Sequence, residues 1–165
     1  MCGISGFFNR TEHQVSMDLI NCINDTLIHR GPDFGKVELY EKVALAHRRL
    51  SIIDLSTGAN QPMSTPHGRY TIVFNGEIYN FHEIRLALEK KGVSFSSHSD
   101  TEVILHAFEA YGCDCFSMFN GMFALAIYDH TNGTLLLARD QFGIKPLYFS
   151  NSADVFIFGS EIRRY

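Results

Sequence analysis

Cys2 stands directly behind Met1, so removal of the initiator methionine would place a thiol and a free α-amino group on one residue. An initiator methionine that precedes a small residue is commonly removed. An α-amino group has a pKa of roughly 7.7–8.0 and can accept the proton of a neighbouring thiol. Residues 3–8 predict a short strand that would hold Cys2 on a rigid element. Cys2 is therefore a candidate nucleophile that carries its own base, and the alternative is an ordinary small residue after Met1.

Acyl-transfer chemistry also needs an oxyanion hole, and the pair Asn75-Gly76 is the candidate. The Asn75 amide donates two hydrogens, and a glycine lets its backbone N–H approach a substrate closely. Asn-Gly is also a strong signal of a tight hairpin turn. Spacing alone favours the turn, so the oxyanion hole is a hypothesis that depends on the rest of the site.

Charged residues that could hold a free amino acid occur at two places. Arg49 lies between two stretches of strand character, and arginine is suited to gripping a carboxylate at two points. His47 and Arg48 are rivals, because spacing does not choose among three successive residues. Asp100 falls in the first turn of an expected helix, where it could cap the helix or receive a substrate ammonium group. Four histidines are candidate bases, each with a structural or surface role as the more common alternative: His29, His47, His98 and His106.

The helices and strands that must position these residues are predicted from hydrophobic periodicity and from Gly, Pro and other turn residues. Two-residue alternation predicts strands at 3–8, 36–40, 43–47, 70–75, 122–129, 134–139, 147–150 and 155–159. Helical spacing predicts helices at 16–29, 81–91 and 99–111, with Ser16 as a possible N-cap of the first and the spacing of a capping box at Ser99–Glu102 in the third. Thr131-Asn132-Gly133, between the strands 122–129 and 134–139, is a hairpin signal. Residues 54–69 form a long loop of the kind that often serves as a functional lid. Runs of strands joined by short turns indicate an α+β domain in which mostly antiparallel sheets pack against helices.

Composition limits the class of protein. The 165 residues suit one domain with a sizeable core, since 45% are hydrophobic. A net charge of −4, with acids and bases mixed along the chain, gives no footprint for nucleic acid or an anionic membrane. No signal peptide or membrane-spanning run is recognisable. The four cysteines match no zinc spacing and indicate a reducing compartment, so we expect a cytoplasmic protein without a metal site.

Motifs along the whole chain resemble one family. The chain resembles the glutaminase domain of class II glutamine amidotransferases, which are N-terminal-nucleophile hydrolases, and it is most similar to asparagine synthetases. Pro32 and the stretch 140–148 favour that branch over the phosphoribosyl and hexosamine branches. The resemblance implies an αββα sandwich with mostly antiparallel sheets packed between helices. The residues that carry it are 1–4, 29–33, 45–54, 61–63, 75–80, 99–102, 119–124, 138–148 and 159–161.

The resemblance also implies a role for each candidate. Cys2 would be the nucleophile, with Asn75 and the Gly76 N–H as the oxyanion hole. Arg49 would bind the α-carboxylate of glutamine, and Glu77 and Asp100 its α-ammonium. The pocket would be lined in addition by Leu50, Ile52 and Ile53, and Arg30 would support Cys2 from behind. The loop after Asp54 would close over bound glutamine.

The implied activity is hydrolysis of L-glutamine to glutamate and ammonia through a Cys2 thioester. Ammonia would pass to an ATP-activated carboxylate, with aspartate as the expected acceptor and a sugar acid or another metabolite as the alternative. A rival interpretation is a non-catalytic glutamine-binding or partner-docking module. Retention of Met1 would produce that state, because the amine would stay in a peptide bond.

The resemblance further implies that residues 1–165 are a glutaminase domain truncated before its last strands. The ATP-pyrophosphatase synthetase domain of the family opens with a Ser-Gly-Gly-x-Asp-Ser loop, and that sequence does not occur in this chain. We therefore expect no cofactor in this domain, and ATP and Mg only in a synthetase domain that acts in cis or in trans. The full-length protein could form a homodimer.

Overall fold

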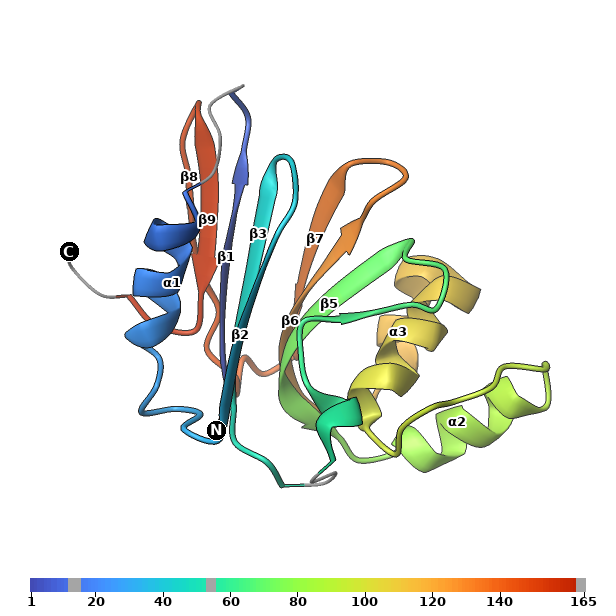
Figure 1. Cartoon of the computed structure of the whole chain (residues 1–165). Helices are drawn as coiled ribbons and strands as arrows, with labels where there is room; N and C mark the ends of the chain where they lie inside the picture. Colours follow the sequence, from blue (N-terminus) through green and yellow to red (C-terminus); the bar gives the residue numbers. More distant parts are fainter. Residues whose placement is uncertain (12–15, 53–55, 163–165) are drawn as a thin grey trace.

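The computed structural model describes residues 1–11, 16–52 and 56–162, and within them two antiparallel sheets face each other (Figure 1). The first sheet contains β1 (Gly3–Asn9), β2 (Phe34–Leu39), β3 (Val43–Arg49), β8 (Tyr148–Asn151) and β9 (Val155–Gly159). Its spatial order is β2-β3-β1-β9-β8. The second sheet contains β4 (Met63–Ser64), β5 (Tyr70–Ile78), β6 (Gly121–Asp129) and β7 (Thr134–Arg139), in that order.

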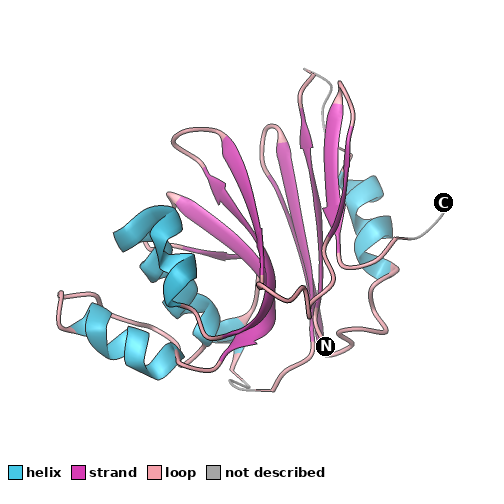
Figure 2. Ribbon diagram, turned by 180° about the vertical axis from the view of Figure 1, so that it is seen from behind, coloured by secondary structure: helices cyan, strands magenta, loops and turns pink. Residues whose placement is uncertain are grey.

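Helices cover the outer faces of both sheets (Figure 2). Helix α1 (Met17–Asp25) packs on the first sheet, and α2 (Phe81–Glu89) and α3 (Asp100–Tyr111) pack on the second. Two short 3₁₀ segments, η1 (Thr57–Ala59) and η2 (Gly112–Met118), complete the described elements. The layers run helix, sheet, sheet, helix, so the predicted αββα sandwich of antiparallel sheets is confirmed.

Strand alternation builds the core between the layers. Ile4 on β1 and Leu45 on β3 point toward the second sheet and pack with Val73 of β5. Phe7 of β1 points the other way, against α1. Ile72 and Phe74, the neighbours of Val73, pack under α2 and α3. Each sheet is therefore apolar on both faces, as expected of a middle layer.

Helix starts follow the predicted caps more closely than helix ends. The Ser16 hydroxyl accepts a hydrogen bond from Leu19 N, which begins α1 as expected. The predicted helix runs to residue 29, but regular helix ends at Asp25. Beyond that point the chain continues in tight turns, such as Arg30 N to Leu27 O at 2.9 Å. Arg48 of β3 donates to the last-turn carbonyl of Asn24 at 3.1 Å, so a tertiary contact finishes the helix.

The expected strand 70–75, closed by Gly76, is too short. Strand β5 continues through Asn75 and Gly76 to Ile78 and pairs with β6 along its whole length. Asn75-Gly76 is therefore not a hairpin turn, and that interpretation is wrong. A Cβ at Gly76 would lie 2.3 Å from Met122 O and 2.7 Å from Phe123 Cα, so close packing against β6 requires glycine.

Part of the predicted loop 54–69 has regular structure. Its described portion contains η1 and the two-residue strand β4, which pairs with Thr71 and Ile72 of β5. Gln61 ties this portion to the second sheet, because its Oε1 accepts from Phe74 N at 2.6 Å. Residues 53–55, which include the start of the proposed closing loop, lie outside the described residues.

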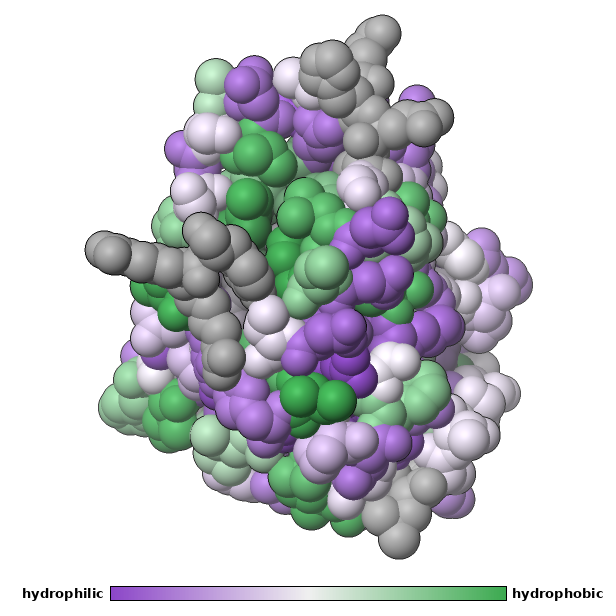
Figure 3. Space-filling model, turned by 60° about the vertical axis from the view of Figure 1, so that its left-hand side comes forward, coloured by the Kyte–Doolittle hydropathy of each residue, from purple (hydrophilic) through white to green (hydrophobic). Residues whose placement is uncertain are grey.

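The outer face of the first sheet is only partly covered by α1. Apolar side chains gather on the face that carries α1 and the β8–β9 hairpin (Figure 3). They line an open hollow of about 560 Å³ that includes Ile23, Tyr148, Phe149 and Ile157. Within the described residues, no helix has the length and apolar character needed to cross a bilayer.

Candidate active site

The end of β3 places two basic side chains, His47 and Arg49, on the inner face of the first sheet. The register pairs Gly3 with Arg48, so Cys2 comes beside the end of β3. Leu45 faces the second sheet, and alternation therefore turns His47 and Arg49 inward as well. Arg48 points outward and pairs with Asp25 of α1. Of the three successive residues, His47 and Arg49 therefore reach the interior and Arg48 does not.

Cys2 is held at the mouth of this interior by backbone and side-chain contacts. Its Sγ accepts from Leu50 N at 3.4 Å and lies 3.6 Å from Leu50 O. Arg30 donates from Nε to Cys2 O at 3.0 Å and from Nη1 to Glu161 at 3.0 Å. Arg30 thus holds the Cys2 backbone carbonyl, and its role behind Cys2 remains an implication of the resemblance.

Strand β5 supplies the opposite wall. Asn75 follows Val73 by two residues, so its side chain faces the first sheet and Cys2 rather than the helices. Asn75 is 1% exposed, and its Nδ2 has no hydrogen-bond partner among the described residues. A buried amide donor without an acceptor is destabilising by roughly 1–3 kcal/mol. Such a donor is well suited to an oxygen that arrives with a ligand.

Asp100 enters from the N-terminus of α3. It is 5% exposed, and its Oδ2 accepts from Ile78 N at 3.1 Å, which ties α3 to the end of β5. Burial, with a smaller contribution from the negative charge of Glu77, raises the pKa of Asp100 to about 6. Glu77 and Asp100 therefore face the same space as two carboxyl groups, an arrangement that favours a cationic ligand.

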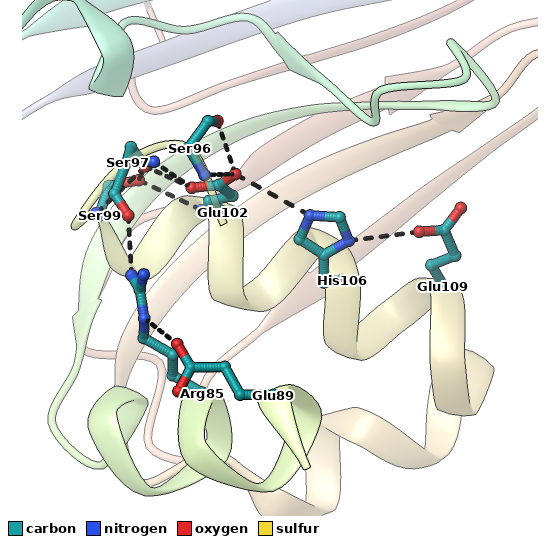
Figure 4. Close-up of polar contacts among 8 residues, drawn as sticks. All are labelled: Arg85, Glu89, Ser96, Ser97, Ser99, Glu102, His106 and Glu109. Atoms are coloured by element: carbon teal, nitrogen blue, oxygen red, sulfur yellow. Dashed lines mark hydrogen bonds and ion pairs between the residues drawn. The ribbon is translucent and has the colours of Figure 1, made fainter. Parts of the chain in front are cut away.

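A polar network fixes the helix end that presents Asp100 (Figure 4). Ser99 caps α3, with its hydroxyl accepting from Glu102 N at 3.3 Å. The Glu102 carboxylate accepts from the backbone N–H and hydroxyl of Ser96 and of Ser97, at 2.7–2.8 Å. The predicted capping box is therefore half formed, because Glu102 bonds to these two serines and Ser99 N donates to Ser97 Oγ. Arg85 of α2 donates to Ser97 O at 2.7 Å and locks the loop from outside.

Arg49 carries a positive charge in the interior, whereas His47 is neutral. Arg49 is 7% exposed and donates from Nη1 to Ser56 O at 2.8 Å and to Asn60 Oδ1 at 2.6 Å. Its charge is thereby held at the floor of the site. Burial lowers the pKa of His47 to about 3, and its Nε2 donates to Phe74 O at 3.2 Å because a carbonyl can only accept. His47 is neutral at working pH and is a poor general base.

One cavity of about 200 Å³ unites these groups. A cavity of this volume can hold a small molecule such as a free amino acid. The predicted site residues that line it are Cys2, Arg49, Leu50, Ile52, Asn75, Gly76, Glu77 and Asp100. Arg30 lies behind it, and Ile53 is outside the described residues. The three other candidate histidines, His29, His98 and His106, do not line it.

The structure also adds residues that sequence reasoning missed. These wall residues are Met1, His47, Ala59, Gln61, Phe74, Ser99, Thr101, Met122 and Lys145. His47 was considered as a base and as a rival of Arg49, but not as a neutral wall residue, and Lys145 lay inside the motif 138–148 without a role. Among the described residues, no cluster of His, Cys, Asp and Glu has the geometry of a metal site. All four cysteines are free thiols, in line with the absence of a disulfide framework from the sequence.

The fold defines the class of protein. The structure superimposes on glutamine phosphoribosylpyrophosphate amidotransferase from B. subtilis with a TM-score of 0.81, at 21% identity, over 96% of this chain and 42% of that one. At this identity the likeness concerns the fold alone, which this chain shares with that amidotransferase.

Sequence comparison then gives the family. Residues 1–164 match the model of the glutamine amidotransferase domain, and the chain belongs to that family. It is 44% identical to asparagine synthetase [glutamine-hydrolyzing] 1 of Bacillus subtilis over 98% of this chain, and 36% identical to a putative asparagine synthetase [glutamine-hydrolyzing] 2 of Methanocaldococcus jannaschii over 99%. The chain spans 26% and 34% of the length of these two relatives.

Proposed function

We propose that this domain hydrolyses L-glutamine and that Cys2 is the nucleophile. The observation that carries the proposal is the single cavity in which Cys2, Asn75, Arg49 and Asp100 meet from four separate segments. A thiol, a partnerless amide donor, a cation and a carboxyl pair are the groups that a zwitterionic amino acid with a side-chain amide requires.

The reaction uses these groups in order. The Cys2 thiolate attacks the side-chain amide carbon, and the negative oxygen is received by Asn75 Nδ2 and the Gly76 N–H. The terminal amine of Cys2 takes the thiol proton and returns it to the departing nitrogen, which leaves as ammonia. Water then hydrolyses the thioester to release glutamate and regenerate the thiol. An acid–base group in this position contributes roughly 10²–10⁴-fold to the rate.

Recognition of glutamine falls to the charged ends of the cavity. Arg49 binds the α-carboxylate, and Glu77 with Asp100 binds the α-ammonium. Leu50 and Ile52 line the aliphatic part of the side chain, together with Ile53, whose role rests on the resemblance alone. We propose that this reaction uses the side chains of the domain and the Cys2 amine, without a cofactor or metal.

The ammonia acceptor belongs to a further domain. We propose that a synthetase domain, in cis or in trans, uses ATP and Mg to activate a carboxylate that then receives the ammonia. The relatives named asparagine synthetase support aspartate as that carboxylate. A sugar acid is the alternative acceptor, and a homodimer of the full-length protein is compatible with this arrangement.

One observation favours a second candidate function for the unprocessed chain. Met1 lines the cavity together with Cys2, and its Sδ contacts Lys145 Nζ at 3.4 Å. While Met1 is present, the Cys2 nitrogen is in a peptide bond and is not a base. The unprocessed chain is then a glutamine-binding module, and removal of Met1 both frees the amine and opens the cavity.

The test compares the protein with and without Met1. Intact-mass measurement establishes which form is present, and free glutamate and ammonia are assayed for each. We expect turnover only in the form that starts at Cys2, and covalent labelling of Cys2 by the glutamine analogue 6-diazo-5-oxo-norleucine. Equal turnover by a form that retains Met1 would refute the amine as base. Labelling of the exposed Cys22 instead would refute the nucleophile.

A further inference from the structure

Lys145 contributes a buried ammonium group to the wall of the Cys2 cavity. It is 6% exposed, whereas its near neighbours Phe142 and Ile144 are 86% and 58% exposed. This is the reverse of the usual order, in which apolar side chains are buried and lysine lies in water. The segment before β8 therefore turns a cation toward the active site.

The buried charge of Lys145 has no carboxylate partner within ion-pair distance among the described residues. The contact that its Nζ makes is with Met1 Sδ at 3.4 Å, and a thioether is a weak acceptor. A buried charge without a counter-ion destabilises the fold. Lys145 and Cys2 line the same cavity, so this charge lies in the space that the candidate nucleophile faces.

The Lys145 backbone is held rigidly by Asp140. The Asp140 carboxylate accepts from Phe142 N and Ile144 N through Oδ1, and from Phe123 N and Lys145 N through Oδ2, at 2.9–3.1 Å. Phe123 pairs with Gly76 across β5 and β6. The same carboxylate thus ties Lys145 to the strand beside the oxyanion pair. Arg139 closes the loop by donating to Lys145 O at 2.6 Å.

We propose that Lys145 is a positioning residue, an inference that rests on the proposed function. Its fixed positive charge favours the thiolate and the neutral amine of the processed Cys2. Removal of Met1 takes away the sulfur that Lys145 contacts and leaves its ammonium facing the new N-terminus. A unit charge acts over several ångströms where water is excluded. It disfavours an additional proton on either group of Cys2, so the nucleophile is active at lower pH.

Other charged groups face the same cavity. Arg49 has the same sign but is held by Ser56 and Asn60. Glu77 and Asp100 are of opposite sign and would be occupied by the substrate ammonium. Arg30 lies behind the cavity, where it donates to Cys2 O and is paired with Glu161, and His47 in the cavity wall is neutral. Lys145 is thus the cation that faces the cavity from the segment between β7 and β8.

The test uses the processed protein and three variants. Lys145→Met removes the charge and keeps the length, Lys145→Arg keeps the charge, and Lys91→Met is the control on an exposed lysine over the Tyr111 ring. Two pH profiles are measured near pH 6–9: kcat/KM for glutamine, and the rate of Cys2 alkylation by iodoacetamide without glutamine.

We expect the acidic limb of both profiles to move upward by about one pH unit in Lys145→Met. This is a loss of roughly tenfold near pH 6.5 that vanishes near pH 9, while Lys145→Arg and Lys91→Met follow the wild type. A loss of equal size at every pH, an unchanged profile, or Lys145→Arg behaving like Lys145→Met would each overturn the proposal. If Lys145→Met does not fold, Lys145→Gln takes its place. Should the wild type not hydrolyse glutamine, the proposed function fails, and the alkylation profile still decides the role of Lys145.

Discussion

Two carboxyl groups at the start of α3 are almost equally buried, and their pKa values are shifted in opposite directions. Asp100 is 5% exposed and Glu102 is 6% exposed. Burial acts to raise the pKa of both. For Glu102 the hydrogen bonds from Ser96 and Ser97 outweigh burial and hold its pKa below the ordinary value. For Asp100 the backbone hydrogen bonds do not outweigh burial and the charge of Glu77, and its pKa rises to about 6.

This difference in pKa distinguishes buried polar groups that are satisfied within the chain and stabilise the fold from groups that a ligand would satisfy. Glu102 is compensated within the chain, and its network holds the helix end in place. Asp100 is incompletely compensated, as is Asn75 on the other side of the cavity, whose Nδ2 has no partner in the described part of the chain. Groups of the second kind lie around Cys2, and we therefore expect mutations of the two kinds to affect activity and stability in opposite ways.

Replacing the nucleophile has the largest expected effect. Cys2→Ala is expected to lower glutamine hydrolysis by roughly 10⁴-fold or more, the order seen when a nucleophile is removed. Glutamine binding should persist, because Arg49 and Asp100 are untouched. A glutamate assay and titration calorimetry measure the two quantities. Cys22→Ala, at an exposed position of α1, should leave both unchanged, and near-normal turnover by Cys2→Ala would remove Cys2 from the mechanism.

The unpartnered amide comes next. Asn75→Ala should lower kcat by about 10²–10³-fold with little change in KM, as for loss of one oxyanion donor. The melting temperature of the Asn75→Ala variant should stay unchanged, because Asn75 Nδ2 has no hydrogen-bond partner among the described residues. The matched control is Asn80→Ala, because the Asn80 amide bonds Met118 O and Asn120 N at 2.9 Å. That variant should lose stability and keep kcat, and the reverse result would break the comparison.

The two carboxyl groups of α3 test the comparison directly. Asp100→Asn should raise the KM for glutamine by roughly 10²-fold, the order of a lost charge pair in a protein interior, without lowering the melting temperature at pH 8. Glu102→Gln should lower stability by roughly 1–3 kcal/mol and change KM little. Thermal unfolding and steady-state kinetics of both variants give the answer. If Glu102→Gln raised KM as much as Asp100→Asn, the distinction between them would be lost.

The smallest expected effect is the change in the KM for glutamine with pH. The α-ammonium of glutamine requires ionised Asp100, whose pKa is about 6. The KM should be constant above that pH and rise by up to about tenfold per pH unit below it. The two groups contribute oppositely to stability: the contribution of Asp100 is lost as pH rises through about 6, and that of Glu102 is lost as pH falls through its lowered pKa. A KM that stays flat from pH 7 to pH 5 would contradict the assignment of Asp100.

Much of the fold could be predicted because its signals are local. The alternation in 122–129 and 134–139 and the Gly133 turn predicted the β6–β7 hairpin, which the structure confirms. Ser16 and Ser99 predicted two helix starts in the same way. The end of α1 was missed because a contact from Arg48 finishes it. The length of β5 was missed because its pairing with β6 outweighs the turn preference of Asn-Gly.

The sequence named eight of the residues that line the Cys2 cavity, and it did not give their arrangement. Periodicity in the sequence by itself determined the α+β class. The ordered motifs carried the family resemblance, and that resemblance implied the αββα layers and the roles of the chemical groups. Tertiary structure alone decided that Arg49 rather than Arg48 faces inward, that Asn75 lies within a strand, and that Lys145 enters the cavity. The reason is that burial and the face of a strand depend on partners far away in the chain, and so does the pKa of Asp100, because it depends on what surrounds the carboxyl group.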